Sequence, residues 1–277
     1  MTDTQSSRRT IIELKGAETL PLLQGLITQD PSGEAPYFAC LLTPQGKILF
    51  DFFVIPTEEG ALIDVASEVA AALEKRLKLY RLRAKIDISI RPDLFVHVAE
   101  EGANAPKGAL YWFEDPRLTV LGMRGIVESD GSGAVDRPAS VEWQEYDARR
   151  FAHGVPEFNA DFEGDDVFLL DVNYDVLGGV SYKKGCFVGQ EVTSRMKRKG
   201  EVRKRTVIVR SEGASLREGA EINSGETSLG KIISASGKTG LAIVRLDRWA
   251  KTKESGDQAS IEGVAASLDL PTYLATE

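Results

Sequence analysis

Hydrophobic and polar positions follow two different periods along the first third of the chain. Short apolar runs predict strands at residues 10–14, 37–43, 48–55 and 61–65. Between the second and third runs stands Pro44-Gln45-Gly46-Lys47, a turn sequence in which proline presets φ and glycine tolerates a positive φ. These two strands are therefore expected to form an antiparallel hairpin.

Two helices are expected among these strands. Leu20, Leu23 and Ile27 recur at helical spacing and predict a helix over residues 17–27. A second helix is expected from Ser67, as its N-cap, to about Arg83. Its predicted buried stripe consists of Val69, Leu73, Leu77 and Tyr80.

Further strands and one helix follow. Alternation of polar and apolar residues predicts strands at 85–90, 94–98 and 118–121, with loops at 100–108 and 128–138. The charged and aromatic segment 141–153 predicts a helix, because Gly154 and Pro156 stand where a helix stops. After Arg205, glycines separate the apolar runs of a predicted small β-barrel, at 206–210, 230–235 and 241–246.

The order of these elements favours an α+β fold over a doubly wound parallel sheet, because the hairpin requires antiparallel pairing. A chain of 277 residues is long enough to bury a core without disulfides or a structural metal. We therefore expect an ordinary globular protein.

Composition and charge indicate the cellular compartment and the kinds of partner to expect. Two widely separated cysteines, Cys40 and Cys186, argue against disulfides and for a reducing compartment, so a cytoplasmic location is expected. The polar segment Met1–Arg9 and the lack of a long apolar run predict no signal peptide and no membrane insertion.

The net charge of −8 argues against general nucleic-acid binding, but nine Lys or Arg and two Glu fall between residues 183 and 205. This local positive charge indicates an anionic ligand or partner, or a solvated surface.

Several kinds of chemistry are not expected. With only two histidines and no serine in a nucleophile-elbow sequence, a histidine-dependent hydrolase is not expected, and His97 is interpreted as structural. Gly237-Lys238-Thr239 lacks the first glycine of a phosphate-binding loop. Two cysteines cannot hold an iron–sulfur cluster alone, and zinc-ligand spacing is missing, so no resident metal site is expected.

A cysteine among glycines and lysines is the strongest candidate for chemistry. Cys186 lies in the segment Lys183-Lys184-Gly185-Cys186-Phe187-Val188-Gly189-Gln190-Glu191. Two adjacent lysines favour the thiolate by Coulomb attraction, and the glycines let a ligand approach the backbone closely. By residue type alone, the alternative is a buried, inert thiol packed beside Phe187 and Val188.

The segment Lys184–Glu191 resembles the signature of the YgfZ family, folate-binding proteins that support iron–sulfur enzymes and are similar in fold to the glycine-cleavage aminomethyltransferase. Other segments resemble this family in order and spacing, namely 23–30, 42–48, Arg150, 154–156 and 230–246. The resemblance implies antiparallel sheets with packed helices around a central cavity, plus a small C-terminal β-barrel. It divides the chain into a folate-binding region at 1–204, made of two interleaved α+β subdomains, and a barrel domain at 205–277.

The same resemblance implies a function in the assembly, maintenance or repair of iron–sulfur proteins, with tRNA-modifying enzymes among the candidate clients. The implied cofactor is tetrahydrofolate or a one-carbon derivative, and the implied partners are iron–sulfur proteins or cluster-assembly factors. A non-catalytic or weakly catalytic factor is favoured, in which Cys186 acts on a cluster, a partner thiol or a folate adduct. The residues expected to hold folate are Thr28, Arg150, Asn173, Lys184, Gly185, Gly189, Gln190 and Glu191.

Two further hypotheses stay open at this point. The first is a folate-dependent aminomethyltransferase or demethylase. In the related transferase, the pattern Gly-x-Ile-Leu is followed by two aspartates, whereas Phe50 and Asp51 follow it here. Asp51 is therefore the remaining candidate for the carboxylate that methylene transfer would use near the folate nitrogen. The alternative for Asp51 is a solvated strand residue. The second hypothesis treats Arg195–Arg205 as an RNA-binding or partner-docking strip, against the alternative of a solvated loop.

Overall fold

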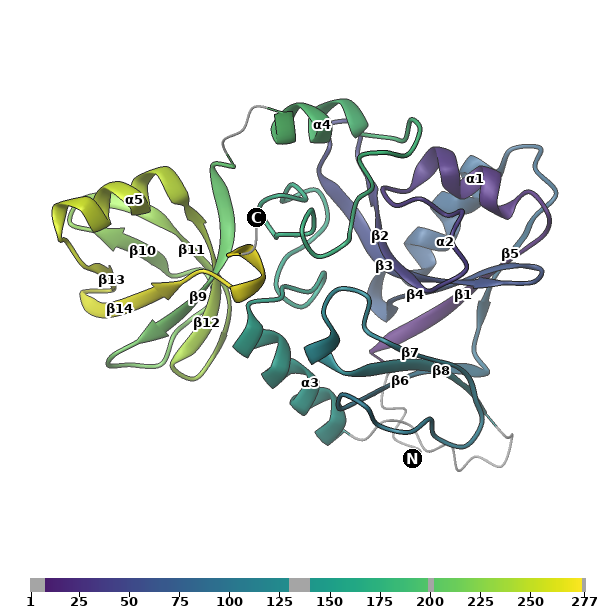
Figure 1. Ribbon diagram of the computed structural model, residues 1–277, viewed down its shortest axis with the longest axis horizontal. Coiled ribbons are helices and arrows are strands. Elements are labelled where there is room, and N and C mark those ends of the chain that lie inside the picture. Colours follow the sequence, from purple (N-terminus) through teal and green to yellow (C-terminus); the bar gives the residue numbers. More distant parts are fainter. Residues whose placement is uncertain (1–7, 130–139, 199–201, 276–277) are drawn as a thin grey trace. The chain divides into compact units, whose positions relative to one another are not determined.

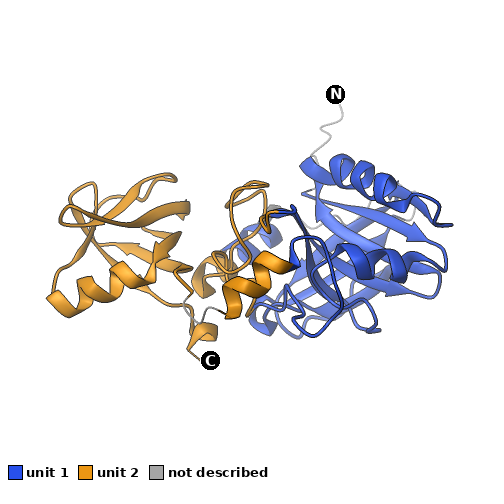
Figure 2. Ribbon diagram, turned by 90° about the horizontal axis from the view of Figure 1, so that it is seen from above, with its two compact units in different colours: residues 1–44, 48–147, 177–190 blue, residues 45–47, 148–176, 191–277 orange. Residues whose placement is uncertain are grey.

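The computed structural model describes residues 8–129, 140–198 and 202–275. Its chain forms two compact units (Figure 2). Unit 1 consists of residues 1–44, 48–147 and 177–190, and unit 2 of residues 45–47, 148–176 and 191–277. Segments from both sides of the predicted domain boundary at 204–205 belong to unit 2, and that boundary stays a prediction.

Unit 1 is built on a five-stranded antiparallel sheet with the strand order β2-β3-β4-β1-β5 (Figure 1). The predicted hairpin is confirmed, because β2 pairs antiparallel with β3. The predicted strands before and after it are also present. The bounds are β1 Arg9–Lys15, β2 Tyr37–Leu42, β3 Ile48–Thr57, β4 Gly60–Ala66 and β5 Asp87–Arg91.

Helices α1, Thr19–Leu26, and α2, Ser67–Arg81, belong to the same unit, and α2 packs on strands of this sheet. The predicted N-cap is wrong by one position, since Ala66 occupies the cap and makes no side-chain cap bond. The Ser67 hydroxyl instead lies 2.7 Å from the hydroxyl of Thr10. The buried face of α2 consists of Ala70, Leu73 and Leu77, whereas the predicted Val69 and Tyr80 are half-buried.

A second, three-stranded sheet completes unit 1, with the order β6-β8-β7. Its strands are β6 Leu94–Ala99, β7 Ala109–Glu114 and β8 Met123–Glu128. The strand predicted at 118–121 is wrong, because Thr119–Leu121 forms a 3-10 helix that ends at Gly122 with φ +93°. The loop predicted at 100–108 is confirmed, and most of the loop predicted at 128–138 lies outside the described residues.

Buried charges connect the two sheets of unit 1. Both oxygens of the fully buried Asp64 carboxylate, on β4, accept hydrogen bonds: one from Arg9 on β1 at 2.6 Å, the other from Arg124 on β8 at 2.6 Å. A third buried guanidinium, that of Arg117, pairs with Asp115 at 2.7 Å. All three guanidinium groups lie over the ring of Phe53, at 4.1 to 5.7 Å from its centroid.

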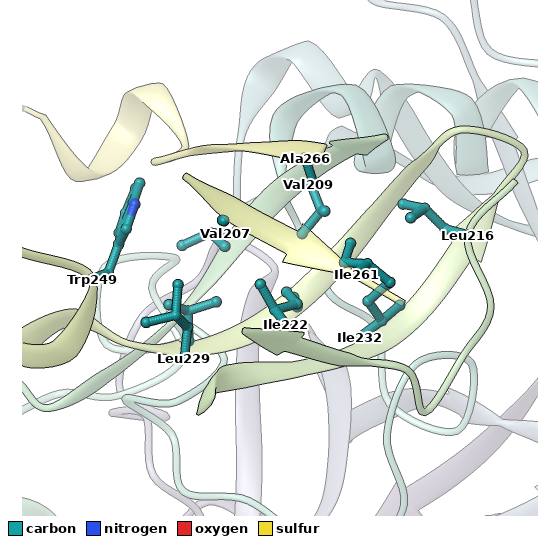
Figure 3. Close-up of a cluster of buried hydrophobic side chains, with 12 residues drawn as sticks. Val207, Val209, Leu216, Ile222, Leu229, Ile232, Trp249, Ile261 and Ala266 are labelled. Carbon is teal, nitrogen blue, oxygen red and sulfur yellow. The ribbon is translucent and has the colours of Figure 1, made fainter. Parts of the chain in front are cut away.

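Unit 2 contains the predicted C-terminal barrel, which closes in the order β10-β11-β12-β9-β14-β13. Its apolar interior includes Val207, Leu229, Ile232 and Trp249 (Figure 3). The predicted helix 141–153 is confirmed as α3, Ser140–His153, and the chain passes from unit 1 to unit 2 within it. The other bounds are α4 Gln190–Arg198, β9 Lys204–Ser211, β10 Glu221–Ser224, β11 Thr227–Ser236, β12 Thr239–Arg245, α5 Leu246–Ser255, β13 Ala259–Ile261, β14 Val264–Asp269 and the 3-10 helix Thr272–Leu274.

The substitution Asp64→Asn removes the carboxylate charge between Arg9 and Arg124, and it leaves two guanidinium groups buried beside a neutral amide. We expect the free energy of unfolding to fall by about 3–5 kcal/mol, measured by urea denaturation. The control is Glu262→Gln, which breaks the exposed pair of Glu262 with Arg217 and should change stability by less than about 0.5 kcal/mol. Similar losses in both variants would contradict a structural role of the buried pair.

Candidate functional site

The loop that carries Cys186 lies in unit 1 and is bonded to the segment that follows α1. The backbone N–H of Ser181 donates to the Thr28 carbonyl at 3.0 Å. The Gln29 side chain donates to the Gly178 carbonyl at 2.7 Å, and the Thr28 hydroxyl donates to the Gly179 carbonyl at 2.6 Å. Three hydrogen bonds therefore hold the first half of the cysteine loop, residues 177–190, to residues 28 and 29.

Thr28 also connects this loop to the five-stranded sheet. Its side chain is fully buried, and its hydroxyl accepts a hydrogen bond from the N–H of Cys40 on β2 at 2.8 Å while it donates to Gly179. Its backbone N–H donates to the Cys40 carbonyl at 2.9 Å. A buried hydroxyl that is used both as donor and as acceptor fixes the loop relative to the strand.

Lys184 anchors the second half of the loop. Its ammonium group donates to the carbonyls of Ile27, at 2.6 Å, and Gln29, at 3.0 Å, and lies 5.3 Å from the centroid of the Phe187 ring. Ile27 is the C-cap of α1, where helix carbonyls lack intrahelical partners. Burial lowers the pKa of Lys184 to about 8, against the opposing charge of Asp30. The side chain predicted to contact folate is thus directed into the protein.

Cys186 is exposed between two buried residues, Lys184 and Phe187. The alternative of a buried, inert thiol at this position is therefore wrong. Gln190 closes the loop: its backbone N–H donates to the Phe187 carbonyl at 3.2 Å and its side chain to the Gly185 carbonyl at 3.4 Å. Gly189 adopts φ +81°, a conformation that favours glycine. The anchors on both sides present the thiol to solvent.

Asp51 lies in β3 opposite Cys40 of β2, and both residues are buried. The alternative of a solvated strand residue is therefore wrong for Asp51. Burial raises the pKa of the Cys40 thiol, the negative charge of Asp51 raises it further, and a hydrogen bond with Thr28 opposes the shift. Asp51, Cys40 and Thr28 thus form a contiguous buried group next to the cysteine loop. A catalytic role for Asp51 stays a prediction.

Arg150 and Asn173 belong to unit 2, where their side chains hold that unit together. The buried Arg150 guanidinium is ion-paired with Asp161, whose carboxylate also accepts the backbone N–H of Glu157 at 2.7 Å. The buried Asn173 amide donates to the Thr206 carbonyl at 2.9 Å and to the Tyr273 hydroxyl at 3.0 Å. Both predicted folate ligands are engaged in internal contacts.

The structure brings together seven of the ten predicted site residues in unit 1. These are Thr28, Asp51, Lys184, Gly185, Cys186, Gly189 and Gln190. The other three, Arg150, Asn173 and Glu191, belong to unit 2, and Glu191 is exposed at the start of α4. Sequence reasoning missed the carbonyl acceptors of Ile27 and Gln29 and the contact between Thr28 and Cys40. The hairpin pattern placed Cys40 on β2, but nothing in the local sequence indicates that Thr28 contacts this strand.

The basic strip predicted at Arg195–Arg205 is not uniformly available to a partner. The buried Arg205 guanidinium is paired with Asp175 and also donates to the Leu170 carbonyl at 3.2 Å. Residues 199–201 of the strip lie outside the described residues. In the described ranges, no group of three or more His, Cys, Asp or Glu could hold a metal ion, and no helix has the length and apolar character of a membrane span.

Comparisons with known proteins show the family of this chain. The mitochondrial iron–sulfur cluster assembly factor IBA57 of Mus musculus is 31% identical, over 86% of this chain and 75% of its own. The chain belongs to the IBA57 family. The human IBA57 is 30% identical over 85% of this chain and 75% of its own. The family described as CAF17, C-terminal beta-barrel domain, matches residues 203–276.

The fold is that of an aminomethyltransferase with a closed C-terminal barrel, which confirms the predicted α+β class. The crystal structure of the glycine cleavage system aminomethyltransferase T from Bartonella henselae matches with a TM-score of 0.66, at 13% identity. The match covers 96% of this chain and 84% of that structure.

The expected cytoplasmic location is wrong, because the IBA57 relatives are named as mitochondrial proteins. Scarce cysteines indicate a reducing compartment, and this signal does not distinguish one reducing compartment from another.

We expect Lys184→Met to loosen the cysteine loop, because the carbonyls of Ile27 and Gln29 lose their buried donor. The amide of Ser181, which is bonded to Thr28, should exchange its hydrogen about tenfold faster, equivalent to about 1.4 kcal/mol. Hydrogen-exchange mass spectrometry or NMR measures this change. Lys183→Met is the matched control, since Lys183 is exposed and should leave the exchange rate unchanged. Equal rates in both variants would show that Lys184 does not anchor the loop.

Proposed function

We propose that this chain supports the assembly or maintenance of iron–sulfur proteins, with Cys186 as the group that contacts the cluster or the partner protein. One observation carries the proposal: hydrogen bonds of Gly179 and Lys184 hold the loop before Cys186, Phe187 is buried directly after it, and the thiol itself is exposed. The names of the IBA57 relatives support the same function. The YgfZ family, suggested by the segment Lys184–Glu191, is the finer assignment that we propose.

The chemistry proposed for Cys186 is ligand donation. The thiol releases its proton to solvent, and the resulting thiolate donates an electron pair to an iron ion of the cluster, which is here a cargo. No electron transfer is required. Cys40 does not fit this role, since it is fully buried and its pKa is raised by burial.

Replacement of Cys186 by Ser in a strain that lacks the native protein tests the function. We expect the activities of cluster-dependent enzymes, including tRNA-modifying ones, to fall to the level of the deletion strain, because an alcohol is a poor iron ligand. The control is Cys40→Ala at the buried thiol, compared at equal protein abundance. Unchanged cluster-dependent activity in Cys186→Ser would refute the role of the thiol.

Tetrahydrofolate binding is a second part of the proposal, and the residues fit this ligand only in part. The buried carboxylate of Asp51, opposite Cys40, suits the N–H groups of a pterin ring. Arg150 and Lys184 do not fit the role of folate ligands, because their charges are already matched by Asp161 and by backbone carbonyls. The exposed Lys183 and the half-buried Gln190 have more accessible polar groups. No step of the proposed chemistry passes through folate.

Calorimetric titration with tetrahydrofolate tests this part. If Asp51 contacts the pterin, Asp51→Asn should weaken binding by about tenfold or more, as expected when a charged hydrogen-bond acceptor becomes neutral. Glu226→Gln, at an exposed residue of the barrel unit, is the control and should bind like the wild type. A wild-type chain that binds no tetrahydrofolate would refute the folate proposal and leave the proposal for Cys186 intact.

An aminomethyltransferase activity is the alternative function, favoured by the shared fold and by the buried carboxylate of Asp51. In such a reaction the methylene carbon passes from an aminomethyl donor to tetrahydrofolate, and ammonia is released. Incubation with tetrahydrofolate and a series of aminomethyl donors, followed by detection of methylene-tetrahydrofolate, decides between the two. Product formation that Asp51→Asn abolishes would support the alternative, and absence of product with every donor would remove it.

A further inference from the structure

Unit 1 contains a groove that the cysteine loop does not line. Its volume is about 860 Å³, and residues of α1, both sheets and the β3–β4 turn surround it. Leu14, Leu62 and Leu94 form a buried apolar floor. At the rim, Leu20 is 41% exposed and Leu110 is 50% exposed. Exposed leucines beside a concave apolar surface are typical of an interaction site, because their burial by a partner is favourable.

Carboxylates outnumber cationic groups among the residues that line this groove. Arg91 forms ion pairs with Glu13 at 2.9 Å and with Asp93 at 2.6 Å, and Lys15 forms one with Glu59, so both cations that line the groove are already paired. Glu34 and Glu58 also line the groove, and both are exposed. In the described part of the chain, neither has an ion pair. The free surface therefore combines apolar rim residues with two available negative charges, which complements a basic and apolar partner.

A second lobe extends the groove toward the start of α1. It has a volume of about 370 Å³ and shares Lys15, Leu20 and Glu58 with the larger lobe. Thr19 lines this lobe and is 0% exposed, and its hydroxyl has no hydrogen-bond partner among the residues that the structure describes. A buried hydroxyl without a partner is costly, so this position suits a polar group supplied from outside.

We propose that this groove binds a segment of a partner protein in which large apolar side chains are flanked by lysine or arginine. The apolar side chains cover Leu20 and Leu110, and the cations pair with Glu34 and Glu58. A protein segment fits better than a compact ligand, because the two lobes, the leucines and the carboxylates are spread over several elements. This surface is independent of the function proposed for Cys186, and either proposal can fail without the other.

NMR titration of the isotope-labelled full chain tests the proposal, with the peptide acetyl-Lys-Leu-Leu-Arg-Leu-amide as the probe. We expect backbone amide shifts at Leu20, Glu58 and Leu110 that saturate with a Kd of roughly 1 mM or tighter. The double variant Glu34→Lys, Glu58→Lys should weaken binding by at least about tenfold, because attraction becomes repulsion. The acidic analogue acetyl-Glu-Leu-Leu-Glu-Leu-amide should not bind.

The matched control is the double variant Glu163→Lys, Glu226→Lys, which makes the same charge change at two exposed residues of unit 2 and should bind the probe like the wild type. Cys186→Ser should also bind it normally. The proposal is overturned if the shifts fall outside the groove, if both peptides bind equally, or if the two double variants bind alike.

Discussion

The arrangement of the two sheets of unit 1 depends on the ion pairs of the buried Asp64 carboxylate. This carboxylate accepts hydrogen bonds from Arg9 and Arg124, which belong to strands of two different sheets. The side chains of all three residues are almost completely removed from solvent. Charged groups are rarely buried unless they are paired, because transfer from water costs several kcal/mol per ion. The two sheets must therefore keep their relative placement, or a guanidinium is left buried without its carboxylate.

Phe53 adds to this constraint, since the guanidinium groups of Arg9, Arg117 and Arg124 all lie over its ring. Phe53 belongs to β3, the strand that also carries Asp51. The charge cluster therefore holds the same strand whose Asp51 faces Cys40, the neighbour of Thr28. The charge cluster and the cysteine loop are thus connected through the paired strands β3 and β2.

Unit 1 uses its polar groups in two contrasting ways. Near Cys186, the hydroxyl of Thr28 and the ammonium of Lys184 donate hydrogen bonds to backbone carbonyls, whereas the thiol is exposed. In the groove, Thr19 has a buried hydroxyl without a described partner, and Glu34 and Glu58 have exposed carboxylates. The first arrangement holds an exposed thiol in place. The second leaves groups available for a ligand.

The hydrophobic pattern by itself determined most of the elements: the β2–β3 hairpin, helices α1, α2 and α3, and the C-terminal barrel, because each has a local period or turn sequence. The motif around Cys186 likewise marked the candidate loop. Only the tertiary structure decided which of its side chains faces solvent. Lys184 is a charged residue in a loop, so the local pattern predicts an exposed side chain. Its ammonium group is buried instead, because it donates to a carbonyl at the end of α1 that has no partner within the helix. Arg150 is buried because it pairs with Asp161, and nothing in the local pattern of the chain indicates that ion pair. The hairpin pattern placed Asp51 on β3, and only the packing of the sheet decided that its carboxylate is buried.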